Sequence, residues 1–227
     1  MVVNDRKRLR RFPTFWAFLD FCRSYYFFSL FRFNDNHMKA NTKQMHLGGI
    51  YHMYNRGING ESLFRNKENY QLFLEKYARH IHPVAKTYAY SLMGNHFHLL
   101  LEIRTMEEIR EHFLRAGQTE NYQRKFSSEE RILKFVSSQF AHLFNGYTQV
   151  INHAFSRTGG LFEETFRRIH VDSDAYFSSV AIYIHLNPQL HGFTNDFRDY
   201  SYSSFQSHIS DKPTHLERDK ILGWFGG

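Results

Sequence analysis

The sequence predicts an α+β fold, with a ferredoxin-like antiparallel sheet covered by helices on one side. Apolar, β-prone runs and amphipathic stretches follow one another as strand, helix, strand, strand, helices, strand and helix. A Gly94-Asn95 turn joins two of the strands, which are therefore expected to pair as antiparallel neighbours. With 227 residues and 42% hydrophobic content, the chain can bury the core of one domain.

The first part of the fold is predicted to contain three strands and one helix. The strands span 49–56, 86–93 and 95–103, and the helix spans 67–81. The first strand ends at the turn signal Arg56-Gly57. Asn66 can cap the helix, whose apolar residues recur on one face, and Pro83 closes it.

The second part is predicted to be mostly helical. Helices span 106–114 and 132–147, and a strand spans 166–171. Thr105 can cap the first of these helices, and the polar residues 117–130 are expected to form a surface loop. Asp172 or Ser173 can cap a last helix that reaches Pro188, where the proline discourages continuation. This last helix can lie across the sheet.

Residues 1–37 differ in composition from everything that follows. A basic run at 6–11 precedes residues 12–33, half of which are aromatic. A membrane helix is one interpretation, but Asp20, Arg23 and Arg32 interrupt the stretch. We expect Met38 to be the native start, 1–37 to be an atypical basic and aromatic leader outside the native protein, and 38–227 to be a single domain.

The formal net charge of +7 favours a polyanionic partner, with nucleic acid before an anionic membrane surface. Residues 1–37 contribute +4 of that charge, so the argument from charge is weak for the remaining residues. Cys22, the only cysteine, also lies there, which excludes disulfides and thiolate zinc sites from the rest of the chain. We expect a cytoplasmic protein that does not span a membrane.

His96 and His98 form a histidine pair in the predicted strand 95–103. Residues two apart on a strand share one face, with Cα atoms roughly 6 to 7 Å apart, so both imidazoles can converge on one divalent cation. Tyr183 and Asn187 are four apart and share one face of the last helix. Each of these residues has an ordinary alternative role. The two histidines could be polar side chains on a solvent face, Tyr183 a core tyrosine, and Asn187 a residue at the end of the helix that tolerates the turn.

Four blocks in order carry a resemblance. They comprise residues 49–57 with 63–70, 93–100, 159–168, and 183–188 with 199–205. In these blocks the chain resembles the REP-associated tyrosine transposases, within the single-tyrosine transposases that have a histidine-hydrophobe-histidine (HUH) motif. The resemblance spans about residues 47–205. One departure follows Pro188, where the family commonly has a basic residue before a glycine and this chain has Gln189-Leu190-His191-Gly192.

The resemblance implies a DNA transposase that cleaves and rejoins single-stranded DNA at hairpins of palindromic repeats. His96 and His98 match the metal-binding histidines, Tyr183 matches the nucleophile that forms a 5′-phosphotyrosine, and Asn187 is the candidate third ligand. A phenol with a pKa of about 10 is a poor nucleophile at neutral pH, so a polarised phosphate is needed. The family implies Mg²⁺ or Mn²⁺, whereas nitrogen ligands alone favour manganese or zinc.

Five residues are candidate DNA contacts, although a solvated face is the ordinary role of a surface arginine. These are Tyr54, Arg56, Arg104, Arg167 and Arg168. Two other functions stay open: a non-catalytic nucleic-acid-binding module of the same fold, and a metal-dependent phosphodiesterase without a covalent intermediate. The oligomeric state is also open, since a homodimer could supply Tyr183 to the partner's histidines.

Overall fold

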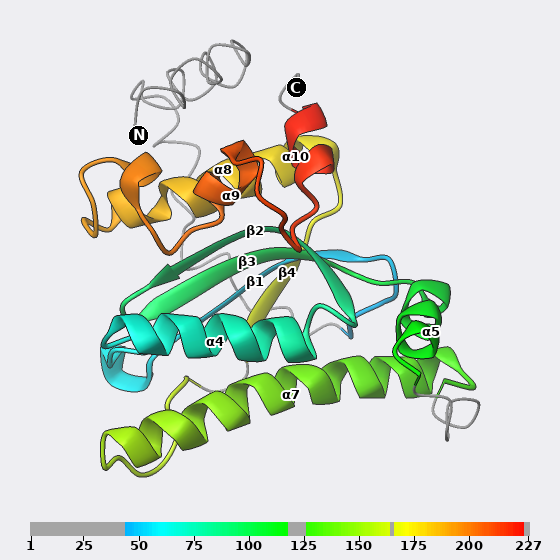
Figure 1. Cartoon of the computed structure of the whole chain (residues 1–227), viewed down its shortest axis with the longest axis horizontal. Coiled ribbons are helices and arrows are strands. Elements are labelled where there is room, and N and C mark those ends of the chain that lie inside the picture. The colour runs from blue at the N-terminus through cyan, green and yellow to red at the C-terminus, as the bar shows by residue number, and fades with distance from the viewer. Residues whose placement is uncertain (1–43, 118–125, 164–165, 225–227) are drawn as a thin grey trace.

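A four-stranded antiparallel sheet lies at the centre of the computed structural model, which describes residues 44–117, 126–163 and 166–224 (Figure 1). The prediction about residues 1–37 falls outside these ranges. The strands are β1 (Ile50–Arg56), β2 (Ala85–Met93), β3 (His96–Ile103) and β4 (Arg167–His170), in the order β2-β3-β1-β4. Every pairing is antiparallel. The predicted α+β fold with a ferredoxin-like sheet is confirmed.

Two long helices, α4 (Lys67–His80) and α7 (Glu129–Ala154), cover one face of the sheet (Figure 1). Their apolar faces and the sheet bury a core that includes Phe73, Phe97 and Phe140. Asn66 caps α4 as predicted, and its side chain accepts a hydrogen bond from the Asn69 backbone nitrogen. A shorter helix, α5 (Met106–Arg115), begins at Thr105 in a capping box.

Helix α7 is longer at both ends than the predicted 132–147. Ser128 caps it, so Glu129 and Glu130 belong to its first acidic turn and not to a surface loop. At the other end the buried Ile151 continues the apolar stripe and extends the helix to Ala154. Of the predicted polar loop, residues 118–125 lie outside the described ranges.

The second face of the sheet is covered too, by α8 (Asp174–Leu190), α9 (Phe205–Ile209) and α10 (Arg218–Trp224) (Figure 1). The prediction that helices cover only one side of the sheet was therefore incomplete. The physical reason is that Tyr88 and Ala89 of β2 and Leu100 of β3 form a buried apolar patch on this second face, which needs its own cover. Leu100 packs on the α8 side with Val180 and Ile184 in a second apolar cluster. Ser173 caps α8, which passes through Pro188 and ends at Leu190.

The chain after α8 runs back along the outer edge of β2. The backbone nitrogen of Leu92 donates to the Tyr202 carbonyl, that of Ser204 to the Tyr90 carbonyl, and that of Glu217 to the Thr87 carbonyl. These bonds satisfy backbone groups that an edge strand otherwise exposes. No helix in the described ranges has the length and apolar character that crossing a bilayer requires.

Candidate active site

Strand alternation and register place the histidine pair under α8. His96 and His98 lie on the same face of β3 as Leu100, which packs against α8. Their ring centroids are 5.5 Å apart and their planes are perpendicular. On β1, Tyr54 lies opposite His98 and Arg56 opposite His96, so these side chains share that face.

Tyr183 of the same chain lies beside the histidines. Its ring centroid is 5.5 Å from that of His98 and 6.0 Å from that of His52, with edge-on geometry in both cases. Tyr183 is partly buried against the apolar cluster that anchors α8 on β2 and β3. The helix therefore delivers the phenol to the histidine strand without a second copy of the chain.

Asn187, one helical turn after Tyr183, faces His96. Its amide oxygen Oδ1 lies 3.4 Å from His96 Nε2. The other ring nitrogen, His96 Nδ1, lies 2.7 Å from the Asn95 side-chain oxygen. Burial, the first of several causes, lowers the pKa of His96 to about 4, so the ring is neutral at pH 7 and carries one N–H. When the shorter contact takes that hydrogen, Nε2 has a lone pair that faces the amide oxygen.

Two acceptor atoms that face one another suit a shared cation. Two ligand atoms, each about 2.1 Å from the same ion, lie roughly 3 to 3.4 Å apart when the ligand–ion–ligand angle is about 90 to 110°. The separation of 3.4 Å between His96 Nε2 and Asn187 Oδ1 is in this range. Asn187 is fully buried, and its Nδ2 has no hydrogen-bond partner among the described residues. The donor set therefore fits a divalent ion.

Carboxylates do not complete this set. Nowhere in the described ranges do three His, Cys, Asp or Glu side chains form a group that could hold a metal ion. A third protein ligand beside His96 and His98 would therefore be another kind of group, and the Asn187 amide is the one in contact. Amide oxygens are ligands that hard divalent cations accept.

His52 on β1 is a part of the site that sequence reasoning missed. Its Nε2 lies 2.9 Å from His98 Nδ1, and its ring also packs beside Tyr54 and Tyr183. Burial lowers the pKa of His52 to about 3. The signal was available, because His52 precedes Tyr54 by two residues on a strand and therefore shares its face.

His191 and Phe193 line the outer side of His96. The ring centroid of His96 is 4.9 Å from that of His191 and 6.1 Å from that of Phe193. Gly192, with φ of +72°, ends the α8 region in a turn, and the Phe193 nitrogen donates to the Pro188 carbonyl. Both side chains are exposed, Phe193 by 43%. His191 thus stands where the expected basic residue is missing, and its spacing from Asn187 could have indicated this.

The five candidate DNA contacts separate into two groups. Tyr54 packs beside His98 with ring centroids 5.6 Å apart, Arg167 lies opposite Tyr54 on β4, and Arg56 forms an exposed ion pair with Glu163. These three border the histidines. The other two do not.

Arg168 alternates to the opposite face of β4, where it lies near Tyr51. Arg104 follows the far end of β3, and its Nε donates to the His82 carbonyl.

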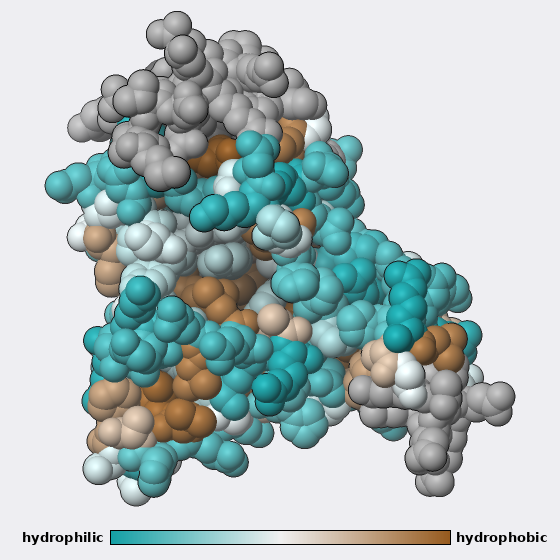
Figure 2. Space-filling view, in the orientation of Figure 1, coloured by the Kyte–Doolittle hydropathy of each residue, from teal (hydrophilic) through white to brown (hydrophobic). Residues whose placement is uncertain are grey.

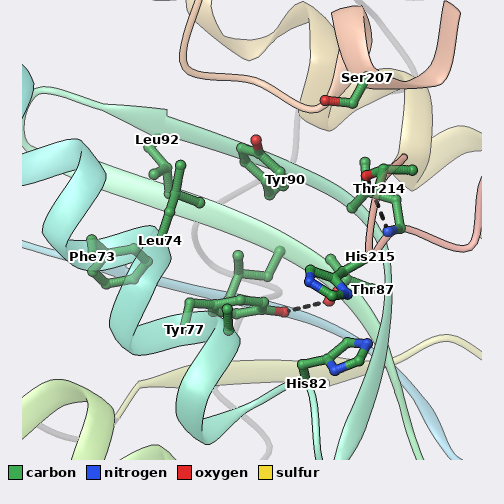
Figure 3. A pocket seen from close by; sticks show the side chains of 13 residues that line it. Phe73, Leu74, Tyr77, His82, Thr87, Tyr90, Leu92, Ser207, Thr214 and His215 are labelled. Atoms are coloured by element: carbon green, nitrogen blue, oxygen red, sulfur yellow. Dashed lines mark hydrogen bonds between the residues drawn. The ribbon is translucent and has the colours of Figure 1, made fainter. Parts of the chain in front are cut away.

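A separate cavity of about 210 Å³ lies between α4 and the segment that covers the β2 edge (Figure 3). Figure 2 shows an apolar hollow between the C-terminal helices and α4. The cavity wall includes Tyr77, whose hydroxyl is hydrogen bonded to Thr87 at 2.8 Å, and the rings of His82 and His215, 4.4 Å apart. None of the predicted site residues lines it.

Comparison with solved structures finds a similar chain in the structure of a REP-associated tyrosine transposase bound to a REP hairpin. The TM-score is 0.54 at 14% sequence identity, and the match covers 74% of this chain and 84% of that chain. At this identity the match shows a shared fold. No family model and no curated protein sequence matches the chain.

Proposed function

We propose that this protein is a single-tyrosine DNA transposase that cleaves and rejoins single-stranded DNA at hairpins of palindromic repeats. One observation carries the proposal: the fold brings Tyr183, His96, His98 and Asn187 to one face, although about 90 residues separate the histidines from the tyrosine. A structural core or a solvated surface gives no reason for a phenol, two imidazoles and an amide to meet. The shared fold with a hairpin-bound transposase supports the same substrate class.

In the proposed reaction the Tyr183 oxygen attacks a backbone phosphorus of the DNA. The phenol gives up its proton as a bond forms between its oxygen and phosphorus. The bond from phosphorus to the 3′-oxygen breaks, and the leaving oxygen takes up a proton as a 3′-hydroxyl. Attack by a 3′-hydroxyl reverses these changes and restores the phenol. Strand joining therefore needs no nucleotide cofactor, because the phosphotyrosine bond retains the phosphodiester.

His96, His98 and Asn187 would hold a divalent ion, Mg²⁺ or Mn²⁺, in this proposal. When bound, the ion would supply Lewis acidity and orientation at the scissile phosphate. His96 and His98 contribute neutral rings, since burial lowers the pKa of both. They can therefore act as nitrogen ligands at neutral pH.

Cations and aromatic rings beside the site would bind the DNA. Arg56 and Arg167 would contact phosphates, and Tyr54 and Phe193 would contact unpaired bases. Arg104 and Arg168, being remote from the histidines, would contact only DNA that extends beyond the cleaved strand. We place the activity in the cytoplasm.

The test is trapping of the covalent adduct. The protein is incubated with Mn²⁺ and labelled single-stranded hairpins from the DNA that flanks its gene, then denatured. Wild type is expected to form a protein–DNA adduct that Tyr183→Phe does not form. Tyr176→Phe, seven residues earlier on α8, is the matched control and should form it.

Other outcomes identify the other functions. Cleavage without any adduct would indicate a phosphodiesterase that uses water. Hairpin binding without cleavage by wild type would indicate a non-catalytic binding module. An adduct that persists in Tyr183→Phe would refute the nucleophile assignment.

A further inference from the structure

We propose that His52 is a positioning residue for His98: it accepts a hydrogen bond from His98 Nδ1 and so keeps His98 Nε2 available as a metal ligand. The inference rests on the metal site of the proposed function. It concerns the contact that His98 Nδ1 makes with a residue of the neighbouring strand β1. It also gives a role to a buried polar residue that the proposed reaction does not otherwise use.

The contact is short and enclosed. His52 Nε2 and His98 Nδ1 are 2.9 Å apart, within normal hydrogen-bond range. The two rings are stacked at 27° with centroids 5.1 Å apart. Only 2% of His52 and 7% of His98 are exposed. The neighbouring strands β1 and β3 hold them, with His52 opposite Leu100 and therefore diagonal to His98.

The contact allows only two arrangements of hydrogens. At 2.9 Å the two nitrogens share one hydrogen, and a neutral imidazole carries one N–H in all. If His52 donates, His98 keeps its hydrogen on Nε2, and that nitrogen cannot bind a cation. If His98 donates from Nδ1, its Nε2 presents a lone pair. Only the second arrangement makes His98 a ligand.

Apart from the contact with His98, the surroundings of His52 do not favour a histidine on grounds of stability. Its Nδ1 is buried and has no hydrogen-bond partner among the described residues, and a buried unpaired polar atom is destabilising. Its surroundings on this face are apolar or aromatic, with Leu100 opposite and Tyr54 and Tyr183 beside it. An apolar side chain would suit the position better. The service that a histidine provides here is the hydrogen bond to His98.

The arrangement also matches how metal-binding histidines are usually held. A ligating imidazole donates its other N–H to an acceptor that fixes the tautomer and the ring orientation. For His96 that acceptor is the Asn95 side-chain oxygen, at 2.7 Å. For His98 the corresponding acceptor is His52 Nε2. Both histidines of the pair then present Nε2 to the same side.

The experiment measures Mn²⁺ affinity by calorimetry, without DNA, for three variants of the full chain. His52→Leu removes the acceptor and is expected to weaken Mn²⁺ binding by about 10- to 100-fold. His52→Gln keeps an acceptor near the position of Nε2 and should stay within severalfold of wild type. His170→Leu changes an exposed histidine that alternation places on the opposite face of the sheet, and should bind like wild type.

The stability of His52→Leu distinguishes a positioning role of His52 from a packing role. Urea unfolding of the metal-free protein should show His52→Leu to be close to wild type in stability, since the loss of the unpaired His52 Nδ1 offsets the loss of the acceptor for His98 Nδ1. A purely structural His52 would give the reverse: lower stability with unchanged Mn²⁺ affinity, which overturns the proposal. Equal losses of affinity in His52→Gln and His52→Leu would also overturn it.

If His52→Leu does not fold, nitrogen NMR of the metal-free wild-type protein tests the inference by locating the hydrogen on the His98 ring. His98 is expected to carry its hydrogen on Nδ1, and a hydrogen on Nε2 would refute the inference. The result is independent of transposition. Normal Mn²⁺ binding without a DNA adduct would refute the proposed function alone, whereas an adduct with unchanged Mn²⁺ affinity in His52→Leu would refute only the role of His52.

Discussion

Two substitutions of Asn187 test its assignment as a metal ligand, because one should weaken Mn²⁺ binding and the other should preserve or strengthen it. Replacing it with alanine removes the amide oxygen near His96 Nε2 and should weaken Mn²⁺ binding about tenfold. Asn187→Asp supplies a carboxylate, the ligand type that hard divalent ions prefer, and should bind Mn²⁺ at least as tightly as wild type. Calorimetric titration measures both. Equal affinity in the alanine variant would remove Asn187 from the ligand set.

Phe193 offers a test of base contacts at the same scale. Phe193→Ala should weaken binding of a single-stranded hairpin with unpaired flanks by about 1 to 3 kcal/mol, because a stacking surface beside His96 is lost. Phe193→Trp should restore it. The measurement is fluorescence anisotropy in a Tyr183→Phe background, which prevents cleavage. Leu114→Ala, at an exposed apolar residue of α5, is the control. Equal weakening by the control would indicate a general surface effect.

At the residue scale, sequence reasoning was strongest where spacing alone sets direction. His96 and His98 share a face as strand alternation requires, and Tyr183 and Asn187 both reach the histidines as helical spacing requires. The same alternation shows that two consecutive strand residues cannot both line one site, so Arg168 was not to be expected beside Arg167. The residue pairs that meet between β1 and β3 could not be predicted, because they depend on the strand register, which the sequence pattern does not specify.

At the scale of elements, α8 and the segment after it are joined by buried imidazoles. His185 Nε2 lies 2.8 Å from the Ser204 hydroxyl, and the His208 ring packs 5.5 Å from that of His185. Burial lowers the pKa of His208 to about 4 and that of His185 well below its ordinary value. Both rings are therefore neutral in the folded protein throughout the neutral range.

The buried His185 and His208 predict that the protein loses stability in mild acid. In the unfolded chain both histidines have a pKa of about 6.5, so below that pH the unfolded state binds protons that the folded state does not. Stability should be fully present above about pH 6.5. It should fall as pH approaches 4, by up to about 1.4 kcal/mol per pH unit for each histidine.

The measurement is the free energy of urea unfolding at pH 7.5, 6.5 and 5.5 in metal-free buffer. His208→Gln cannot titrate at this position, so its stability should depend less steeply on pH than that of wild type. Identical slopes in the two proteins would show that His208 does not contribute.

Element boundaries show where sequence patterns were sufficient. Caps at Asn66, Thr105 and Ser173 were readable because each side chain bonds its own helix. The length of α7 was not, since its last turns are held by packing of Ile151 and not by a local signal. In the helical layer over the second face of the sheet, α8 was predicted from the sequence, whereas α9 and α10 were not. The segment that covers β2 contributes single backbone bonds with no periodic pattern.

At the scale of the whole molecule, the proposed cleavage is expected to occur in cis. Tyr183 lies 5.5 Å from His98 of the same chain, measured between ring centroids. A mixture of Tyr183→Phe and His96→Ala proteins should therefore form no adduct with the hairpin, because neither chain has a complete site. Adduct formation comparable to wild type in the mixture would indicate that tyrosines are exchanged between copies. Each variant alone is the control.

The covered edge of β2 has a consequence for synthesis on the ribosome. Ser204, which bonds the Tyr90 backbone, lies 114 residues further along the chain. The nascent chain completes β2 and β3 long before it contains the segment that protects their outer edge. During that interval the edge is open to pairing with other strands. Premature termination before residue 200 would make this exposure permanent and direct the truncated product towards aggregation.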